Sequence, residues 1–212
     1  MDLVFFGDTH ELHREVTVPA GDILICTGDF TMFSKSLRAI KDFDEWLGEQ
    51  PHPQKWVVPG NHEFFLEADS RRRSLLSNAQ VLIDEAVTVE GLRFYGSPMT
   101  PLYGGAFGKS SSSDRKQHWS KIPNDTHILI THGPPHGILD LSPRPPDRMG
   151  DPELLDRIKQ LRQLRLHAFG HVHGAYGLVE DDGVTFANVA LMGHLDELVH
   201  KPLVIRMRPV KS

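Results

Sequence analysis

Five short apolar segments, each followed by polar side chains of the metal-binding type, constrain most strongly what this chain can fold into. In the clearest case, residues 23–26 read Ile-Leu-Ile-Cys and lead into Gly28 and Asp29. A short run of β-branched and leucine residues between glycines is typical of a strand that is buried on both faces. Open α/β sheets keep their functional sites at the carboxyl ends of such strands, so we expect Asp29 to lie in a site.

The other four segments end in the same way, and all five are expected to meet at one rim. The polar residues that follow them are Asp8 and His10 after residues 3–6, Asn61 and His62 after 56–58, His132 after 128–130, and His171 and His173 after 168–169. One such coincidence would mean little, because an Asx turn beside a surface histidine is common. Five of them predict a pocket of oxygen and imidazole ligands, with Asp29 as the shared central carboxylate.

Local spacing refines this expectation for the first and last motifs. Asp8 and His10 alternate, so both side chains point the same way if the backbone stays extended. His171 and His173 have the same spacing between two glycines, which predicts two imidazoles on one side of the chain. The Pro-Gly pair before Asn61 indicates a tight turn that lets the backbone approach a ligand closely.

Composition and charge exclude several classes of protein. The 212 residues, 39% hydrophobic and 24% charged, fit one compact domain over residues 1–212. A net charge of −5 argues against an extended nucleic-acid binder or a membrane-surface binder, although small anionic substrates remain possible if metal ions supply positive charge. The single Cys26 is expected in the core. We see no leader or membrane-spanning segment and expect a cytoplasmic protein; the oligomeric state stays open.

The remaining segments are predicted from capping and periodicity. We expect a helix over residues 34–47 with a serine cap and Gly48 just past its end, and a short arginine-rich helix over 68–77. A hairpin should turn at Glu90-Gly91, and a helix should start at Asp151-Pro152. Residues 97–121 read as one long irregular loop, and residues 177–207 as three short strands that complete a second layer.

The combined ligand set favours a pair of ions. It contains carboxylates, an amide and imidazoles but no thiolate, which suits Mn²⁺, Fe or Zn²⁺ rather than a structural zinc site. Seven ligands are too many for one ion, whereas two ions bridged by one carboxylate accommodate them and can clamp both oxygens of a phosphoryl displacement.

The order Asp-x-His, Gly-Asp, Gly-Asn-His-Glu, His, Gly-His-x-His, each motif after a strand, resembles the calcineurin-like metallophosphoesterase superfamily. The resemblance spans residues 8–173 and is greatest to its small metallophosphoesterase-domain-containing phosphodiesterases. It implies an α/β (α+β) fold: a β-sandwich of two mixed sheets flanked by helices, in four α/β/β/α layers. It also implies one ion on Asp8, His10, Asp29 and His173, and a second on Asp29, Asn61, His132 and His171, with Mn²⁺ the expected metal and Fe or Zn²⁺ the alternatives.

The resemblance also implies a function. The expected enzyme is a phosphodiesterase that hydrolyses small phosphodiesters such as cyclic nucleotides with a bridging water activated by the two ions. His62 and Asn61 are the expected catalytic residues, and His62, His136 and Arg148 the expected substrate-binding residues. Met32 and Phe33 stand where the protein Ser/Thr phosphatases of the superfamily carry an aspartate and an arginine, which argues against that activity. A phosphomonoesterase or nuclease on the same site and a non-catalytic scaffold are the alternatives; the intact ligand set counts against the last.

Overall fold

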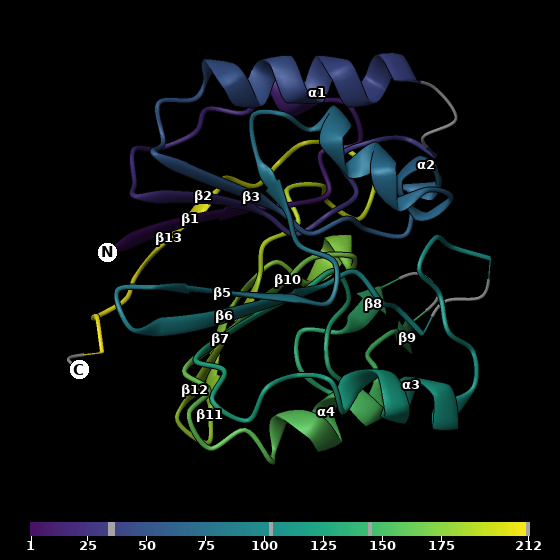
Figure 1. The fold of residues 1–212 in the computed structure, drawn as a ribbon. Helices are drawn as coiled ribbons and strands as arrows, with labels where there is room; N and C mark the ends of the chain where they lie inside the picture. Colours follow the sequence, from purple (N-terminus) through teal and green to yellow (C-terminus); the bar gives the residue numbers. More distant parts are fainter. Residues whose placement is uncertain (34–36, 102–103, 144–145, 211–212) are drawn as a thin grey trace.

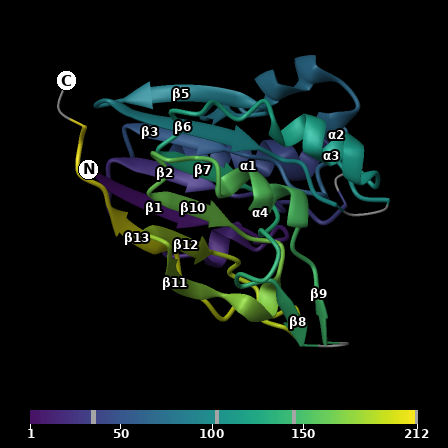
Figure 2. The ribbon, with the colours of Figure 1, turned by 90° about the horizontal axis from the view of Figure 1, so that it is seen from below.

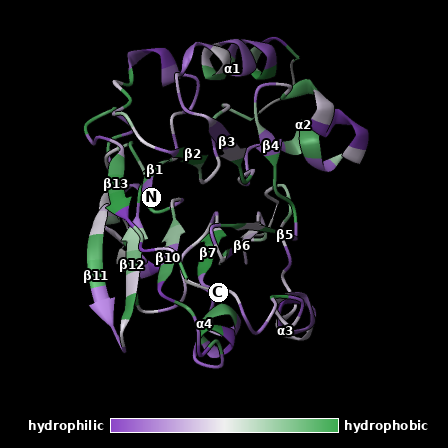
Figure 3. Cartoon of the chain, turned by 60° about the vertical axis from the view of Figure 1, so that its left-hand side comes forward, coloured by the Kyte–Doolittle hydropathy of each residue, from purple (hydrophilic) through white to green (hydrophobic). Residues whose placement is uncertain are grey.

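Two mixed β-sheets packed face to face form the centre of the molecule (Figures 1 and 3). The computed structural model describes residues 1–33, 37–101, 104–143 and 146–210. The first sheet has the order β13-β1-β2-β3-β4, with bounds β1 (Asp2–Phe6), β2 (Ile23–Cys26), β3 (Gln54–Val57), β4 (Gln80–Val81) and β13 (Leu203–Arg206). The second has the order β11-β12-β10-β7-β6-β5, with bounds β5 (Glu85–Val89), β6 (Leu92–Ser97), β7 (Ile128–Thr131), β10 (Leu166–Phe169), β11 (Gly177–Asp181) and β12 (Val184–Asn188).

Helices cover the outer faces of both sheets, which completes the expected four layers (Figure 1). The α-helices are α1 (Leu37–Glu49), α2 (Phe64–Glu67), α3 (Ser112–Trp119) and α4 (Pro152–Ile158), and the 3₁₀ turns are η1 (His13–Glu15), η2 (Ser70–Leu75) and η3 (His173–Ala175). Helix α1 packs on the first sheet, and α3 and α4 pack on the second. A separate ribbon pairs β8 (Leu141–Pro143) with β9 (Pro146–Arg148).

The apolar strands are continuous because they are buried on both faces. In β1, Leu3 and Phe5 point into the core between the sheets, whereas Val4 and Phe6 join the layer under α1. All four side chains are fully buried. Strands β1, β2 and β3 run parallel to one another, as do β6, β7, β10 and β12, and Figure 2 shows β6 and β10 pointing the same way. The carboxyl ends of the motif-bearing strands therefore meet at one edge of the sandwich.

Several predicted elements are confirmed. The chain turns at Glu90 and Gly91, both with positive φ, between the antiparallel β5 and β6. Helix α4 begins after Asp151, whose side chain accepts a hydrogen bond from the Glu153 N–H. Cys26 is buried in the core. Within the described residues, no helix is long and apolar enough to cross a membrane.

Three predictions of elements need correction. Helix α1 continues to Glu49, so Gly48 is inside it: a Cβ there would lie 3.2 Å from the Asn78 side chain, and the glycine serves close packing rather than capping. The serine cap falls outside the described residues.

The segment 97–121 is not one irregular loop, because Ser111 caps α3 and accepts a hydrogen bond from the Asp114 N–H. Strand β13 does not join the second layer; it pairs antiparallel with β1 in the first sheet.

The arginine-rich segment forms a short helix, as predicted, in the 3₁₀ conformation of η2, and neighbouring residues hold its arginines. The Arg72 guanidinium lies 3.9 Å from the centroid of the Phe65 ring, and Arg73 pairs with Glu85. Of the three aromatic residues in segment 97–121, Trp119 and Phe107 pack against the core, and Tyr103 falls outside the described residues.

Candidate metal centre

The polar residues that follow β1, β2, β3, β7 and β10 converge at the edge of the sandwich where these strands end. Three groups of side chains have ligand atoms within 4.8 Å of one another: Asp8, His10 and His173; His10, Asp29 and His62; and Asp29, His132 and His171. Asp29 and His10 each belong to two groups, so the groups form one continuous cluster. The Asn61 Oδ1 atom lies 2.8 Å from His132 Nε2, so the seven predicted ligands all come together.

Left-handed backbone, not extended backbone, aims these side chains. Asp8, His10, Asp29 and His171 have φ values of 52°, 41°, 50° and 68°, a region that non-glycine residues seldom occupy. The alternation predicted for Asp8 and His10 is therefore wrong, although both reach the same group. Backbone hydrogen bonds from Asp8 N–H to Gly28 O (2.8 Å) and from His10 N–H to Asp29 O (3.0 Å) hold the two loops against each other.

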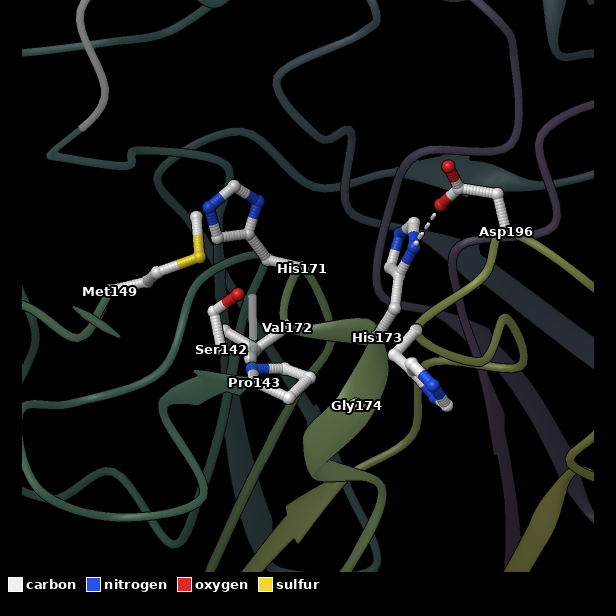
Figure 4. Close-up of a pocket in the computed structure, with 9 residues that line it drawn as sticks. Ser142, Pro143, Met149, His171, Val172, His173, Gly174 and Asp196 are labelled. Atoms are coloured by element: carbon white, nitrogen blue, oxygen red, sulfur yellow. Dashed lines mark hydrogen bonds and ion pairs between the residues drawn. The ribbon is translucent and has the colours of Figure 1, made fainter. Parts of the chain in front are cut away.

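The two histidines of the last motif also diverge from the expected geometry. His171 joins the group of Asp29 and His132, whereas His173, at the start of η3, joins Asp8 and His10. Figure 4 shows the His171 ring beside Met149 and the His173 ring turned toward Asp196. One sequence motif thus serves both ends of the cluster.

Two glycines let the carboxylates of Asp29 and Asp8 lie in direct contact with the backbone. A Cβ at Gly60 would lie 2.2 Å from Asp29 Oδ1, and one at Gly170 would lie 2.0 Å from Asp8 Oδ2. Real Cβ contacts are never this short, so any side chain at either position would displace a carboxylate of the cluster.

Asp29 and His132 form the electrostatic centre. His132 Nε2 lies 3.2 Å from Asp29 Oδ2, and both side chains are almost fully buried. Burial opposes ionisation of Asp29, but the charge of His132 and its hydrogen bond, with His62 and His10, hold the Asp29 pKa well below its usual range. Burial likewise opposes protonation of His132, but the neighbouring Asp29 raises the His132 pKa to about 9.

The donor set fits divalent cations. Asp8 Oδ2 is buried with no hydrogen-bond partner, which a carboxylate oxygen seldom tolerates. His10 Nε2 and His173 Nε2 lie 3.2 Å apart, so two ring nitrogens face each other where a shared cation would satisfy both. Oxygen and imidazole donors of this kind suit Mn²⁺, Fe and Zn²⁺.

Acceptors behind three imidazoles fix which ring nitrogen faces the cluster. His132 Nδ1 lies 2.9 Å from the Thr27 carbonyl, His10 Nδ1 lies 3.3 Å from the Thr31 carbonyl, and His173 Nδ1 lies 3.1 Å from Asp196 Oδ1. Because these oxygens can only accept, each Nδ1 carries a proton, so in the neutral ring Nε2 is the nitrogen left to bind a cation. Asp196 was not predicted as part of the site, because it follows no strand and belongs to no motif.

Glu63 also has a part that the sequence analysis did not assign. Its fully buried carboxylate accepts hydrogen bonds from the N–H groups of Gly60 (2.6 Å), Asp29 (2.9 Å) and Thr31 (3.0 Å) and from Thr31 Oγ1 (2.8 Å). Burial and the charge of Asp29 raise the Glu63 pKa to about 7. Glu63 thereby ties the loop after β2 to the loop after β3; its place in the Gly-Asn-His-Glu motif was the available signal.

His62 lies beside the cluster rather than within its buried centre. Its Nε2 is 3.8 Å from Asp29 Oδ2, and its backbone N–H donates to Asp29 Oδ1 at 2.9 Å. On the opposite edge of the ring, Nδ1 accepts from the Phe33 N–H at 3.4 Å.

The predicted substrate-binding residues His136 and Arg148 belong to none of the three groups. Both are exposed and contact the buried Asp140: Arg148 donates to Asp140 Oδ1 at 2.6 Å, and His136 Nδ1 lies 3.8 Å from Asp140 Oδ2. A pocket of about 170 Å³ lies between this segment and the cluster, lined in part by Ser142, Pro143, Met149, His171, His173 and Asp196 (Figure 4).

A two-sheet sandwich with an Asp/His cluster at the strand ends is typical of metal-dependent hydrolases, and the family comparison narrows the class to phosphoester hydrolases. The chain belongs to the calcineurin-like phosphoesterase family, whose model matches residues 1–175. It is similar to the human metallophosphoesterase domain-containing protein 1, with 36% identity over 95% of this chain and 69% of the relative. Its metal centre is of the dinuclear divalent kind that the family uses, and the protein is a metal-dependent phosphoesterase.

Solved structures show the same fold at low sequence identity. The phosphopantetheinyl hydrolase of Mycobacterium tuberculosis aligns with a TM-score of 0.58 and 16% identity, over 92% of this chain and 90% of that one. A dimetal phosphatase from Danio rerio aligns with a TM-score of 0.57 and 13% identity, over 92% and 88%.

Proposed function

We propose that this protein is a phosphodiesterase that hydrolyses small phosphodiesters, with cyclic nucleotides as the leading substrates. The observation that carries the proposal is the sharing of Asp29 between ligand groups, next to the unpaired carboxylate oxygen of Asp8. Shared carboxylates of this kind are the structural basis of two-metal hydrolysis of phosphoesters.

The proposed ligands divide into two sets that meet at Asp29. Asp8, His10, Asp29 and His173 would hold one ion, and Asp29, Asn61, His132 and His171 would hold the other. We propose Mn²⁺, with Fe or Zn²⁺ as alternatives, since the donors are oxygen and imidazole. When bound, the pair supplies Lewis acidity and lowers the pKa of a nucleophilic water.

The protein groups then position the substrate and stabilise the charge that develops on its oxygens. His62 Nε2 faces the cluster and can donate a hydrogen bond to a phosphoryl oxygen or to the oxygen of the leaving group. Asn61 is 5% exposed and its side-chain oxygen lies beside His132 Nε2, so as a ligand it would also fix the geometry of the second set. The pocket beside His171 and His173 can receive the organic part of a small substrate (Figure 4).

The preference for diesters rests on charge. A diester carries one negative charge, which two divalent ions neutralise without help, whereas a monoester dianion usually requires an added arginine. Next to His62, the chain places the ring of Phe33. Arg148 is engaged by Asp140, and Arg144 falls outside the described residues.

A phosphomonoesterase is the second candidate, because Arg148 and His136 are exposed and belong to the segment whose Ser142 and Pro143 line the pocket. Long nucleic acids are disfavoured by the net charge of −5, since such binding requires many cationic contacts.

A substrate panel tests the proposal. We would measure kcat/KM with Mn²⁺ for an aryl phosphodiester, its monoester counterpart, cyclic nucleotides and single-stranded DNA. We expect a diester to be the best substrate. Monoester turnover about tenfold more efficient than that of any diester, or about 1.4 kcal/mol in transition-state binding, would replace the diesterase assignment with a phosphatase.

A further inference from the structure

Phe33 contacts His62 in two independent ways. The two rings are stacked, with centroids 4.0 Å apart and planes inclined by 18°. The Phe33 backbone N–H also donates to His62 Nδ1 at 3.4 Å. We propose that Phe33 is a positioning residue that holds the His62 imidazole with its proton on Nε2, directed toward the metal cluster. The proposal rests on the proposed function of His62 as a hydrogen-bond donor to the phosphoryl or leaving-group oxygen, but its first test does not require turnover.

The hydrogen-bond chemistry fixes the tautomer. A backbone N–H can only donate, so His62 Nδ1 must accept with its lone pair. The neutral imidazole then carries its single proton on Nε2, the atom that lies 3.8 Å from Asp29 Oδ2. The hydrogen bond that His62 donates therefore comes from the side of the ring that faces the ligand groups.

The backbone of Phe33 is strained in the way that this contact requires. Phe33 has a φ of 50°, a conformation that a bulky aromatic residue rarely adopts. Its side chain is 53% exposed, so burial in the core does not explain the conformation. The preceding residue, Met32, is anchored by a hydrogen bond from its N–H to Glu11 Oε1 at 3.0 Å. The turn at Met32 and Phe33 thereby directs the Phe33 N–H toward His62 Nδ1.

Stacking complements the hydrogen bond. The N–H of Phe33 defines one point of the imidazole, and the parallel ring restricts rotation of the imidazole plane about that point. The His10 ring contacts the His62 ring too, with centroids 4.7 Å apart and planes inclined by 57°. His62 is thereby confined between a cluster residue and an exposed, strained phenylalanine.

Nitrogen NMR of the metal-free protein tests the proposal without turnover. With His62 assigned by comparison with His62→Ala, we expect Nε2 to be protonated and Nδ1 unprotonated in the wild type. Phe33→Ala and Phe33→Gly keep the backbone N–H but lose the stacked ring that stops the imidazole from rotating away from it, so the two nitrogen shifts should draw together as ring orientations and tautomers average. Glycine also accommodates the positive φ, which guards against misfolding. Phe33→Tyr and Met32→Ala should keep the wild-type pattern. A proton on Nδ1 in the wild type, or unchanged shifts in both Phe33→Ala and Phe33→Gly, would overturn the proposal.

Kinetics with a diester of poor leaving group provide the second test. Phe33→Ala should lower kcat about tenfold with KM within about twofold, and Phe33→Tyr should restore the rate. The double variant Phe33→Ala/His62→Ala should lose no more than His62→Ala alone, because Phe33 acts through His62. An additive loss would show that Phe33 acts independently and would contradict the inference. If no phosphoester is hydrolysed at all, the proposed function fails, while the NMR result still decides the tautomer.

Discussion

The buried carboxylate of Glu63 accepts a hydrogen bond from the backbone N–H of Asp29 at 2.9 Å, and it takes three further hydrogen bonds from Gly60 and Thr31. One side chain thus fixes the backbone around the carboxylate that two ligand groups share. The left-handed conformation of Asp29 is costly on its own, and these hydrogen bonds are what hold it.

Glu63→Gln should therefore destabilise the fold. The amide NH₂ cannot accept, so at least one buried N–H loses its partner, at a cost of about 2 kcal/mol. For a chain of this size, that loss corresponds to a fall in Tm of roughly 4–8 °C, measurable by calorimetry of the metal-free protein. Glu49→Gln, at an exposed position, serves as the control. An unchanged Tm for Glu63→Gln would remove Glu63 from this role.

His62→Ala should fold and keep its metals but lose most of its activity. His62 faces the cluster without being needed in either proposed ligand set, and a positioned hydrogen-bond donor to the developing charge is worth about 10² to 10³ in rate. The measurement is kcat on a diester with a poor leaving group, together with metal content. Turnover near that of the wild type would exclude His62 from the mechanism.

Asp196→Ala should weaken metal binding without unfolding the protein. The carboxylate is exposed and accepts from His173 Nδ1, and loss of such a partner usually costs about 10–100-fold in metal affinity. Competition titration with a chelating indicator measures the affinity, with the exposed Asp114→Ala on α3 as control. Equal Mn²⁺ affinity in Asp196→Ala and wild type would show that Asp196 does not orient His173.

Stability should fall in acid because of His167, which lies outside the ligand set. Burial lowers its pKa from 6.5 to about 3, so the folded protein excludes a proton that the unfolded chain binds. The contribution is fully present above pH 6.5 and is lost as pH falls toward 3. Between pH 7 and pH 5 it amounts to about 2 kcal/mol.

His167→Gln should flatten this dependence. We would compare urea unfolding of the metal-free wild type and variant at pH 7 and pH 5. The difference in stability between the two pH values should be smaller in the variant by about 2 kcal/mol. Equal pH dependence would mean that His167 is protonated in the folded state or is not buried as described.

The sequence predicted the strands and the cluster because both depend on local patterns. Continuous apolar runs such as Leu3 to Phe6 occur only where both faces of a strand are buried, and polar residues directly after them must gather at the strand ends. Five repetitions of that pattern made convergence predictable. The resemblance to a known superfamily then supplied the division into two ligand sets and the four layers.

What the sequence did not reveal depends on contacts between distant residues. Strand β13 joins the first sheet because it pairs with β1, which is almost the whole chain away in the sequence. Asp196 reaches His173 from a loop with no motif, and the left-handed turns at Asp8 and His10 are held by carbonyls of another loop. Periodicity carries no information about such partners. The serines before α3 predict a loop as readily as a helix cap, because Ser favours both turns and caps.

Metal analysis of Asp29→Ala tests the central claim most directly. Because Asp29 is shared between the two proposed ligand sets, its loss should empty both positions rather than one. We predict two divalent ions per chain in the wild type and in the control Asp156→Ala, an exposed position on α4, and none retained in folded Asp29→Ala after gel filtration. Two ions per chain in the purified Asp29→Ala protein would contradict the account.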